Sequence, residues 1–246
     1  MKFGKINEIQ PALSHTWEKT IFITFDIEWV TDEIFDWVLN KINQSGIKAT
    51  LFCTHYTDKL QTAKSNNNIE LGIHPNFNYL LNGNFRYGKN IDEVITFYKN
   101  IVPEGTSYRS HCLTQSTILT RAFEKHGLKY DCNSFIPVYG YNYTLEPWLD
   151  FGGEIIKAPM FWEDDIHCMY KWPFDLKLFM KHAGLKIFNF HPVTLLLNIN
   201  DMDKYNQAKP FYNDIAKLKE LKNTGYGVSN FFDEIIQYVK KTPDIL

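Results

Sequence analysis

Two acidic residues stand one residue apart at the end of an apolar run. Residues 21–25 read Ile-Phe-Ile-Thr-Phe, and Asp26 and Glu28 follow. A short, unbroken run of this kind is typical of a strand buried on both faces. If the strand continues through Glu28, both carboxylates point to the same side, where a cation, a proton or water must offset their repulsion. The pair indicates either a chemical site or a solvated strand end with two surface acids.

Chemically capable side chains also follow four later apolar runs. The carboxyl ends of parallel strands meet on one face of an α/β fold, so these side chains should gather there. Each also has a plainer explanation: a loop contact for His111, a sheet cap for His191, and solvation for the acids at 164 and 165. The coincidence of five such strand ends favours a site. The later residues are His74, Asn78, Arg109, His111, Asp164, Asp165 and His191.

These residue types suit metal-assisted hydrolysis. A carboxylate, an imidazole and a further oxygen or nitrogen donor can hold a divalent metal with open positions, as in catalytic zinc sites. Such a metal lowers the pKa of water and polarises a substrate carbonyl. A second carboxylate can accept the proton of the water, and a histidine opposite can protonate the leaving group. An arginine can orient the base and keep it ionised.

The elements that must position these residues alternate between strand and helix at least six times. Strands are predicted at about 21–28, 47–53, 69–73, 107–112, 130–134, 155–159 and 185–190, with helices at about 32–43, 91–102, 117–125 and 175–182. The alternation predicts a mainly parallel sheet with right-handed crossovers. No glycine-rich phosphate loop follows the first strand, which argues against a dinucleotide-binding or P-loop protein.

A single barrel-like α/β domain over residues 1–246 fits this pattern best. Its core should span about residues 20–195, with residues 1–20 over one end and C-terminal helices at about 203–223 and 230–241. Hydrophobic residues make up 44% of the chain and charged residues 22%, which is ordinary for a globular protein. The net charge of -2 gives no nucleic-acid footprint. Aromatic residues, at 16%, weakly favour a sugar-binding cleft.

The cysteine pattern and the lack of long apolar runs bear on location. The four cysteines form no C-x-x-C pair, so we expect reduced thiols and no zinc ribbon. No basic and then apolar leader opens the chain, and no apolar run approaches 18 residues. We therefore expect a cytoplasmic protein without a membrane span. The sequence leaves the oligomeric state open.

The ordered motifs resemble a known family. Thr24-Phe25-Asp26-Ile27-Glu28, then His74-x-x-x-Asn78, Arg109 and Asn189-Phe190-His191-Pro192 resemble the polysaccharide deacetylases of the NodB-homology group, carbohydrate esterase family 4. The match covers about residues 20–195 and is closest to the divergent WbmS type, encoded with O-antigen or capsule genes. The resemblance implies a distorted (β/α)7 barrel and metal-dependent hydrolysis of N-acetyl groups on amino sugars.

The resemblance also implies roles for particular residues. Asp26 corresponds to the general base, Arg109 to the residue that orients it, and His191 to the general acid. Glu28, His74 and Asn78 correspond to the metal ligands, with zinc the expected metal and nickel, cobalt or manganese as alternatives. The fourth motif is loosely matched by Trp162 with Asp164 or Asp165. The residues expected to contact substrate are His111, Trp162, Asp164 and Trp29.

Two departures from the family pattern affect the metal site. The acids of the first motif are commonly adjacent, whereas Ile27 separates them here, and Asn78 stands where a second histidine is usual. An amide oxygen is a neutral ligand that suits harder metals than zinc. Asn78 could bind metal with reduced affinity, His111 could replace it as the third ligand, or the metal could be lost.

The expected function is metal-dependent removal of an acetyl or similar acyl group from an amino sugar during synthesis of a cell-surface polysaccharide. The expected substrate is a small activated or lipid-linked sugar. Two alternatives remain at this point. One is a non-catalytic carbohydrate-binding descendant of the fold, and the other is a metal-free hydrolase of amides or ureides.

Overall fold

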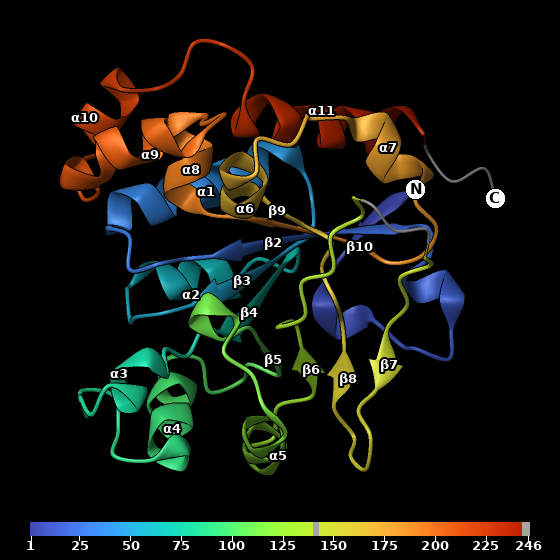
Figure 1. The fold of residues 1–246 in the computed structure, drawn as a ribbon, viewed down its shortest axis with the longest axis vertical. Helices are drawn as coiled ribbons and strands as arrows, with labels where there is room; N and C mark the ends of the chain where they lie inside the picture. Colours follow the sequence, from blue (N-terminus) through green and yellow to red (C-terminus); the bar gives the residue numbers. More distant parts are fainter. Residues whose placement is uncertain (140–142, 243–246) are drawn as a thin grey trace.

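One twisted sheet of ten strands forms the centre of the protein (Figure 1). The computed structural model describes residues 1–139 and 143–242. The strands follow the order β7-β8-β6-β5-β4-β3-β2-β10-β9, and β1 pairs with β2 in addition. Their bounds are β1 Lys2–Gly4, β2 Thr20–Asp26, β3 Ala49–Cys53, β4 Ile69–Ile73, β5 Ser107–Tyr108, β6 Tyr130–Asp131, β7 Trp148–Leu149, β8 Ile156–Lys157, β9 Trp162–Glu163 and β10 Lys186–Phe190.

The strand pairing confirms the predicted fold class. Every pairing is parallel except that of β7 with β8. On one side of β2 the sheet continues through β3, β4, β5, β6 and β8 to β7 at the edge. On the other side of β2 lie β10 and then β9, the last strands of the sheet along the chain. The sheet curls into the distorted α/β barrel that the alternation of elements predicted. In the described part of the chain no ladder joins β9 to β7, so the barrel is open along that side.

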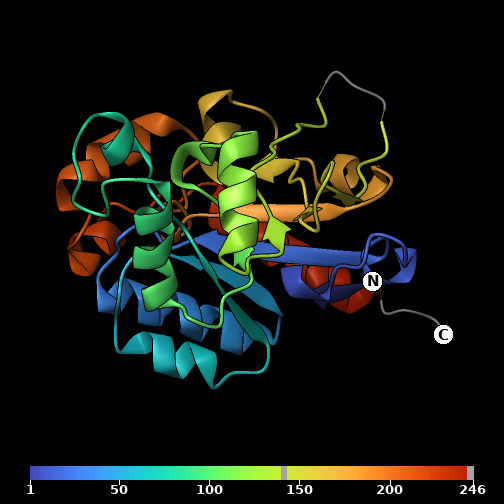
Figure 2. The same ribbon diagram turned by 90° about the horizontal axis from the view of Figure 1, so that it is seen from below.

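Helices cover the outer side of the sheet. In Figure 1, α4 and α5 lie below the sheet, and α1, α8 and α11 lie above it; Figure 2 shows α4 beside α5. The helices are α1 Asp32–Ser45, α2 Lys59–Lys64, α3 Asn78–Leu81, α4 Ile91–Ile101, α5 Thr117–Lys125, α6 Asp164–Met169, α7 Leu176–Lys181, α8 Pro192–Leu197, α9 Met202–Ala208, α10 Ile215–Glu220 and α11 Val228–Lys241.

The expected single helix at 203–223 is wrong. The structure has α9 and α10, separated by a short 3-10 turn at Lys209–Phe211. Pro210 lies in that turn. Its ring locks φ and it has no amide hydrogen, so an α-helix cannot run through it undisturbed. This break lets the segment fold back toward the strand ends.

The two faces of β2 explain why a site can form at its end. All seven of its residues are buried. Successive side chains alternate between faces: Phe25 packs outward on Phe232 of α11, with ring centroids 6.0 Å apart. Phe22 belongs instead to a second apolar cluster with Ile6 and Trp17 of the N-terminal segment. That cluster fills the barrel near the amino ends of the strands, as expected for residues 1–20, and leaves the carboxyl ends to polar side chains.

No helix in the described ranges, 1–139 and 143–242, is long and apolar enough to cross a membrane.

Candidate active site

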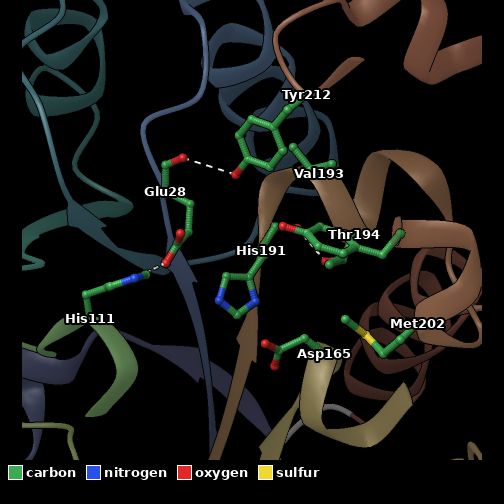
Figure 3. Close-up of a pocket in the computed structure, with 9 residues that line it drawn as sticks. Glu28, His111, Asp165, His191, Val193, Thr194, Met202 and Tyr212 are labelled. Atoms are coloured by element: carbon green, nitrogen blue, oxygen red, sulfur yellow. Dashed lines mark hydrogen bonds and ion pairs between the residues drawn. The ribbon is translucent and has the colours of Figure 1, made fainter. Parts of the chain in front are cut away.

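A cavity opens at the carboxyl ends of β2, β4, β9 and β10, and it has two adjoining compartments. Their volumes are about 190 and 210 Å³. The helical compartment is lined by Glu28, His111, Asp165, His191, Val193, Thr194, Met202, Tyr205 and Tyr212 (Figure 3). The strand-end compartment is lined by Asp26, Glu28, His74, Ser110, His111, Cys112, Leu113, Glu163, Asp165, Ile166 and His191.

Asp26 is held by a fully buried guanidinium group. Arg109 Nη1 donates to Asp26 Oδ1 at 2.9 Å, and Arg109 Nε donates to the Cys132 carbonyl at 3.1 Å. Asn189 Nδ2 donates to the other carboxylate oxygen at 3.0 Å. Burial alone would raise the pKa of Asp26, but Arg109, with His74 and His191, outweighs burial and lowers it. Asp26 is therefore ionised at neutral pH.

The sequence suggested that Glu28 reaches the cavity as part of the first strand, but in the structure it lies beyond the end of that strand. β2 ends at Asp26, and Glu28 and Trp29 both adopt left-handed backbone conformations with φ of 51°. Such a conformation costs a non-glycine residue about 1–2 kcal/mol, and outliers of this kind cluster at functional sites. The Tyr212 hydroxyl donates to the Glu28 carbonyl at 3.0 Å. This turn aims the Glu28 carboxylate at two histidines.

Glu28, His74 and His111 form a cluster that could hold a metal. Glu28 Oε1 lies 2.9 Å from His111 Nδ1 and 3.3 Å from His74 Nε2. One donor atom from each residue lies within 4.8 Å of the others. Burial opposes ionisation of Glu28, but the hydrogen bonds from His111 and His74 lower its pKa. One ionised carboxylate and two imidazoles are the donors of known catalytic zinc sites, so the residues fit the expected group.

Asn78 is not placed with these donors. It begins α3, its side-chain nitrogen donates to Cys112 Sγ at 3.4 Å, and it lines neither compartment. His111 occupies the position in the cluster that the resemblance gave to Asn78. The backbone explains how His111 arrives there, because a 3-10 turn follows β5 directly, and the His111 amide donates to the Pro75 carbonyl at 2.9 Å.

His191 stands across the cavity from this cluster and is held by Asp164. His191 Nδ1 lies 2.6 Å from Asp164 Oδ1, and the His191 amide donates to Asp164 Oδ2 at 2.7 Å. Thr194 also donates its hydroxyl hydrogen to Asp164. Burial would lower the pKa of His191, but Asp164 and Asp165 raise it well above its ordinary value. Asp164 is fully buried and lines neither compartment; its carboxylate contacts His191 and Thr194.

Trp162, which we expected to contact substrate, lies in the core. Its side chain is 1% exposed and packs on Phe190 and Phe231, with ring centroids 5.0 Å away in each case. It is a core residue and lines neither compartment. Trp29 lies at the margin of the site: its ring meets His111 edge-on at 5.2 Å, and it lines a separate groove with Tyr56.

Replacing Trp162 with alanine should lower the free energy of unfolding by about 3–5 kcal/mol, because it leaves a cavity among packed rings. Denaturant unfolding would measure the change. The matched control is Trp148→Ala in β7, whose side chain is 42% exposed, and which should cost less than about 1 kcal/mol. Equal losses in the two variants would contradict the assignment of Trp162 to the core.

Several residues of the cavity were not singled out from the sequence. Glu163 ends β9, a strand of two residues that is too short to give a periodic signal. Asn189 belongs to one of the sequence motifs but was given no role there, although its side chain donates a hydrogen bond to Asp26. Tyr205 and Tyr212 come from the C-terminal segment and line the helical compartment. No local pattern indicates that these tyrosines turn back to the strand ends.

Comparisons with known proteins are consistent with this geometry. A family model described as WbmS-like polysaccharide deacetylase matches residues 23–209. A solved structure from Bordetella bronchiseptica, described as a polysaccharide deacetylase involved in O-antigen biosynthesis, is 32% identical. The match covers 96% of this chain and 98% of that chain, with a TM-score of 0.90.

Other structural matches are more distant. A family 4 carbohydrate esterase from Streptomyces lividans is 10% identical, with 88% of each chain covered and a TM-score of 0.46. A protein from Mycobacterium smegmatis described as a polysaccharide deacetylase is 17% identical, with 97% of this chain and 98% of that chain covered and a TM-score of 0.46. No curated protein matches the chain significantly.

Proposed function

Because the chain belongs to the WbmS-like polysaccharide deacetylase family, we propose that it hydrolyses an N-acyl group, acetyl in the simplest case, of an amino sugar. We propose that this reaction belongs to the synthesis of a cell-surface polysaccharide such as O-antigen. The Bordetella relative is described as involved in O-antigen biosynthesis. The observation that carries the proposal is the position of the Arg109-bound Asp26 between the Glu28, His74 and His111 cluster and the Asp164-bound His191.

We assign the metal ligands as Glu28, His74 and His111. Zinc is the first expectation, and nickel, cobalt and manganese accept the same donors. A bound metal would supply Lewis-acid polarisation of the acyl carbonyl. His74 Nδ1 has no hydrogen-bond partner among the described residues and lies 3.8 Å from Asp26 Oδ1. His74 is therefore the member of the cluster that lies beside the proposed base, Asp26.

The chain's own residues then divide the proton transfers. Asp26, ionised and oriented by Arg109, accepts a proton from the attacking water as its oxygen bonds to the acyl carbon. His191, protonated because of Asp164, donates a proton to the sugar nitrogen as the carbon–nitrogen bond breaks. The acyl group leaves as a carboxylic acid and the sugar as an amine. Transfer of the proton from Asp26 back to His191, directly or through solvent, restores both groups.

The pH dependence of the reaction should report the Asp164–His191 pair. His191 must be protonated to act as the acid, so activity falls as pH rises through its pKa. Asp164 raises that pKa, so Asp164→Asn should move the alkaline limb of the kcat/KM profile to lower pH. At pH values above the new limb we expect a loss of about 10- to 100-fold.

The matched control for this pH shift is Thr194→Val. It removes the hydroxyl that donates to Asp164 but keeps the carboxylate charge beside His191. The alkaline limb should then stay near its wild-type position. A profile unchanged in Asp164→Asn would exclude His191 as the acid.

We propose a small activated or lipid-linked sugar as substrate and the cytoplasm as location. The small size of the compartments, about 190 and 210 Å³, supports a substrate presented one sugar at a time. All four cysteines are free thiols, and three of them are buried, which is compatible with a reducing compartment.

Acetate release from N-acetylated sugar nucleotides and lipid-linked sugars tests the proposal. We expect release that is lost on exhaustive chelation and restored by zinc, cobalt, nickel or manganese. Sugar binding by calorimetry without any release would instead support a non-catalytic carbohydrate-binding protein. Release that is insensitive to chelation would support a metal-free amide or ureide hydrolase and would contradict the metal assignment.

A further inference from the structure

The turn that carries Glu28 is held by two hydroxyl groups from distant parts of the chain. The Tyr212 hydroxyl donates to the Glu28 carbonyl at 3.0 Å (Figure 3), and the Trp29 amide donates to the Thr54 hydroxyl oxygen at 2.9 Å. This carbonyl and this amide belong to one planar peptide unit, the one that joins Glu28 to Trp29. The orientation of that peptide unit is therefore fixed at both of its polar groups.

The peptide unit between Glu28 and Trp29 needs this support because its backbone is strained. Both residues have φ of 51°, in the left-handed region that residues with a side chain rarely adopt. Strain of this kind persists only where the surrounding structure holds it in place. Rotation of either residue to negative φ would turn the peptide unit and break its hydrogen bond to Tyr212 or Thr54. The two hydroxyl groups therefore oppose relaxation of the turn.

The direction of the Glu28 carboxylate depends on this turn. β2 ends at Asp26, so Glu28 lies outside the strand. Its Oε1 atom nevertheless lies 2.9 Å from His111 Nδ1 and 3.3 Å from His74 Nε2. A change of φ at Glu28 would swing its side chain relative to β2 and move the carboxylate away from both imidazoles. The contacts that make the three-residue cluster thus require the left-handed backbone.

Tyr212 comes from a part of the chain that the family motifs do not include. The family model matches residues 23–209, and Tyr212 follows the 3-10 turn at Lys209–Phe211. Its ring packs against the main hydrophobic core and lines the helical compartment. Tyr205 lines the same compartment, but in the described part of the chain it forms no hydrogen bond with Glu28. The contact with the turn therefore distinguishes Tyr212 from its neighbour.

We propose that Tyr212 is a positioning residue for the metal ligand Glu28, and that Thr54 acts with it on the same peptide unit. Tyr212 holds the Glu28 carbonyl, which keeps the Glu28 carboxylate aimed at the position between His74 and His111. It contacts neither the metal nor the reacting atoms. This inference rests on the proposed metal-dependent deacetylation, in which these three residues are the ligands.

The test compares the zinc affinities of Tyr212→Phe and Tyr205→Phe, measured by competition with a chromophoric chelator. Each change removes one hydroxyl group from the same compartment and keeps the ring. Residues that support metal ligands contribute about 10- to 100-fold to affinity, so Tyr212→Phe should weaken zinc binding by about 10-fold and Tyr205→Phe by less than about twofold. A tyrosine with a purely structural role would lower the melting temperature and leave zinc affinity unchanged.

The other end of the peptide unit gives a second test that does not depend on the folding of Tyr212→Phe. Thr54→Val removes the acceptor of the Trp29 amide at nearly constant volume, and zinc affinity should again fall by about 10-fold. Thr54→Ser keeps a hydroxyl group at this position, so its affinity should stay within about threefold of wild type. Wild-type affinity in Thr54→Val would contradict the role of the peptide unit.

The outcomes separate failure of this inference from failure of the proposed function. Wild-type zinc affinity in Tyr212→Phe, or equal losses in Tyr212→Phe and Tyr205→Phe, overturns the inference and leaves the metal assignment intact. Unchanged zinc affinity with a loss of acetate release that excess zinc does not restore would make Tyr212 a substrate contact instead. A wild-type protein that binds no zinc, cobalt, nickel or manganese means that the metal assignment has failed, and the positioning role with it.

Discussion

Asp26→Asn should lower kcat/KM by about 10³-fold or more while the protein still binds metal at the wild-type ratio. Asparagine has nearly the same shape, but its amide cannot accept a proton from the attacking water, and a positioned base contributes about 10²- to 10⁴-fold. Asp26 is also the carboxylate that Arg109 contacts at 2.9 Å. The measurements are acetate release and elemental mass spectrometry on the same preparation.

The Asp26 variant needs a control for folding, because it leaves Arg109 buried without its counter-ion. Loss of one partner of a buried pair costs about 3–5 kcal/mol, so the melting temperature should fall although the protein remains folded. Asp165→Asn removes another carboxylate from the same cavity without affecting Arg109, and its activity should fall by less than about 10-fold. Activity close to wild type in Asp26→Asn would show that another group is the base.

The second large effect is expected on metal affinity, where His111→Ala and Asn78→Ala should differ sharply. His111 Nδ1 lies 2.9 Å from Glu28 Oε1, within the three-residue cluster. Asn78 donates to Cys112 and lines neither compartment. Mutations of residues that only support metal ligands cost 10- to 100-fold in affinity. Loss of His111, which we assign as a ligand, should therefore weaken zinc binding by about 100-fold or more, whereas Asn78→Ala should change it by less than about threefold.

Competition with a chromophoric chelator measures both zinc affinities, and elemental analysis gives the metal content. The reverse pattern, with zinc lost only in Asn78→Ala, would establish Asn78 as the third ligand. Equal losses would mean that both residues contribute. A wild-type protein that binds no zinc, cobalt, nickel or manganese would remove the basis for the ligand assignment.

The sequence alone determined the fold class and the face of the fold that carries the site. The nearly continuous apolar run that precedes Asp26 identifies a strand buried on both faces, and the shorter, largely apolar segments before His74 and His191 identify two further strands. Parallel strands with crossover helices then bring their carboxyl ends together whatever the details of the loops. The pairing of Arg109 with Asp26 was implied by the resemblance of the motifs to those of the polysaccharide deacetylases.

Only the tertiary structure decided which side chains meet within that face. Glu28 reaches His111 because two residues adopt left-handed conformations. Asp164 holds His191 because α6 begins beside α8. Trp162 is drawn into the core, and Glu163 is placed opposite Asp26 by a strand of two residues. Contacts of this kind join residues far apart in the sequence through turns and short elements. Their geometry depends on packing from the whole barrel, which local periodicity does not record.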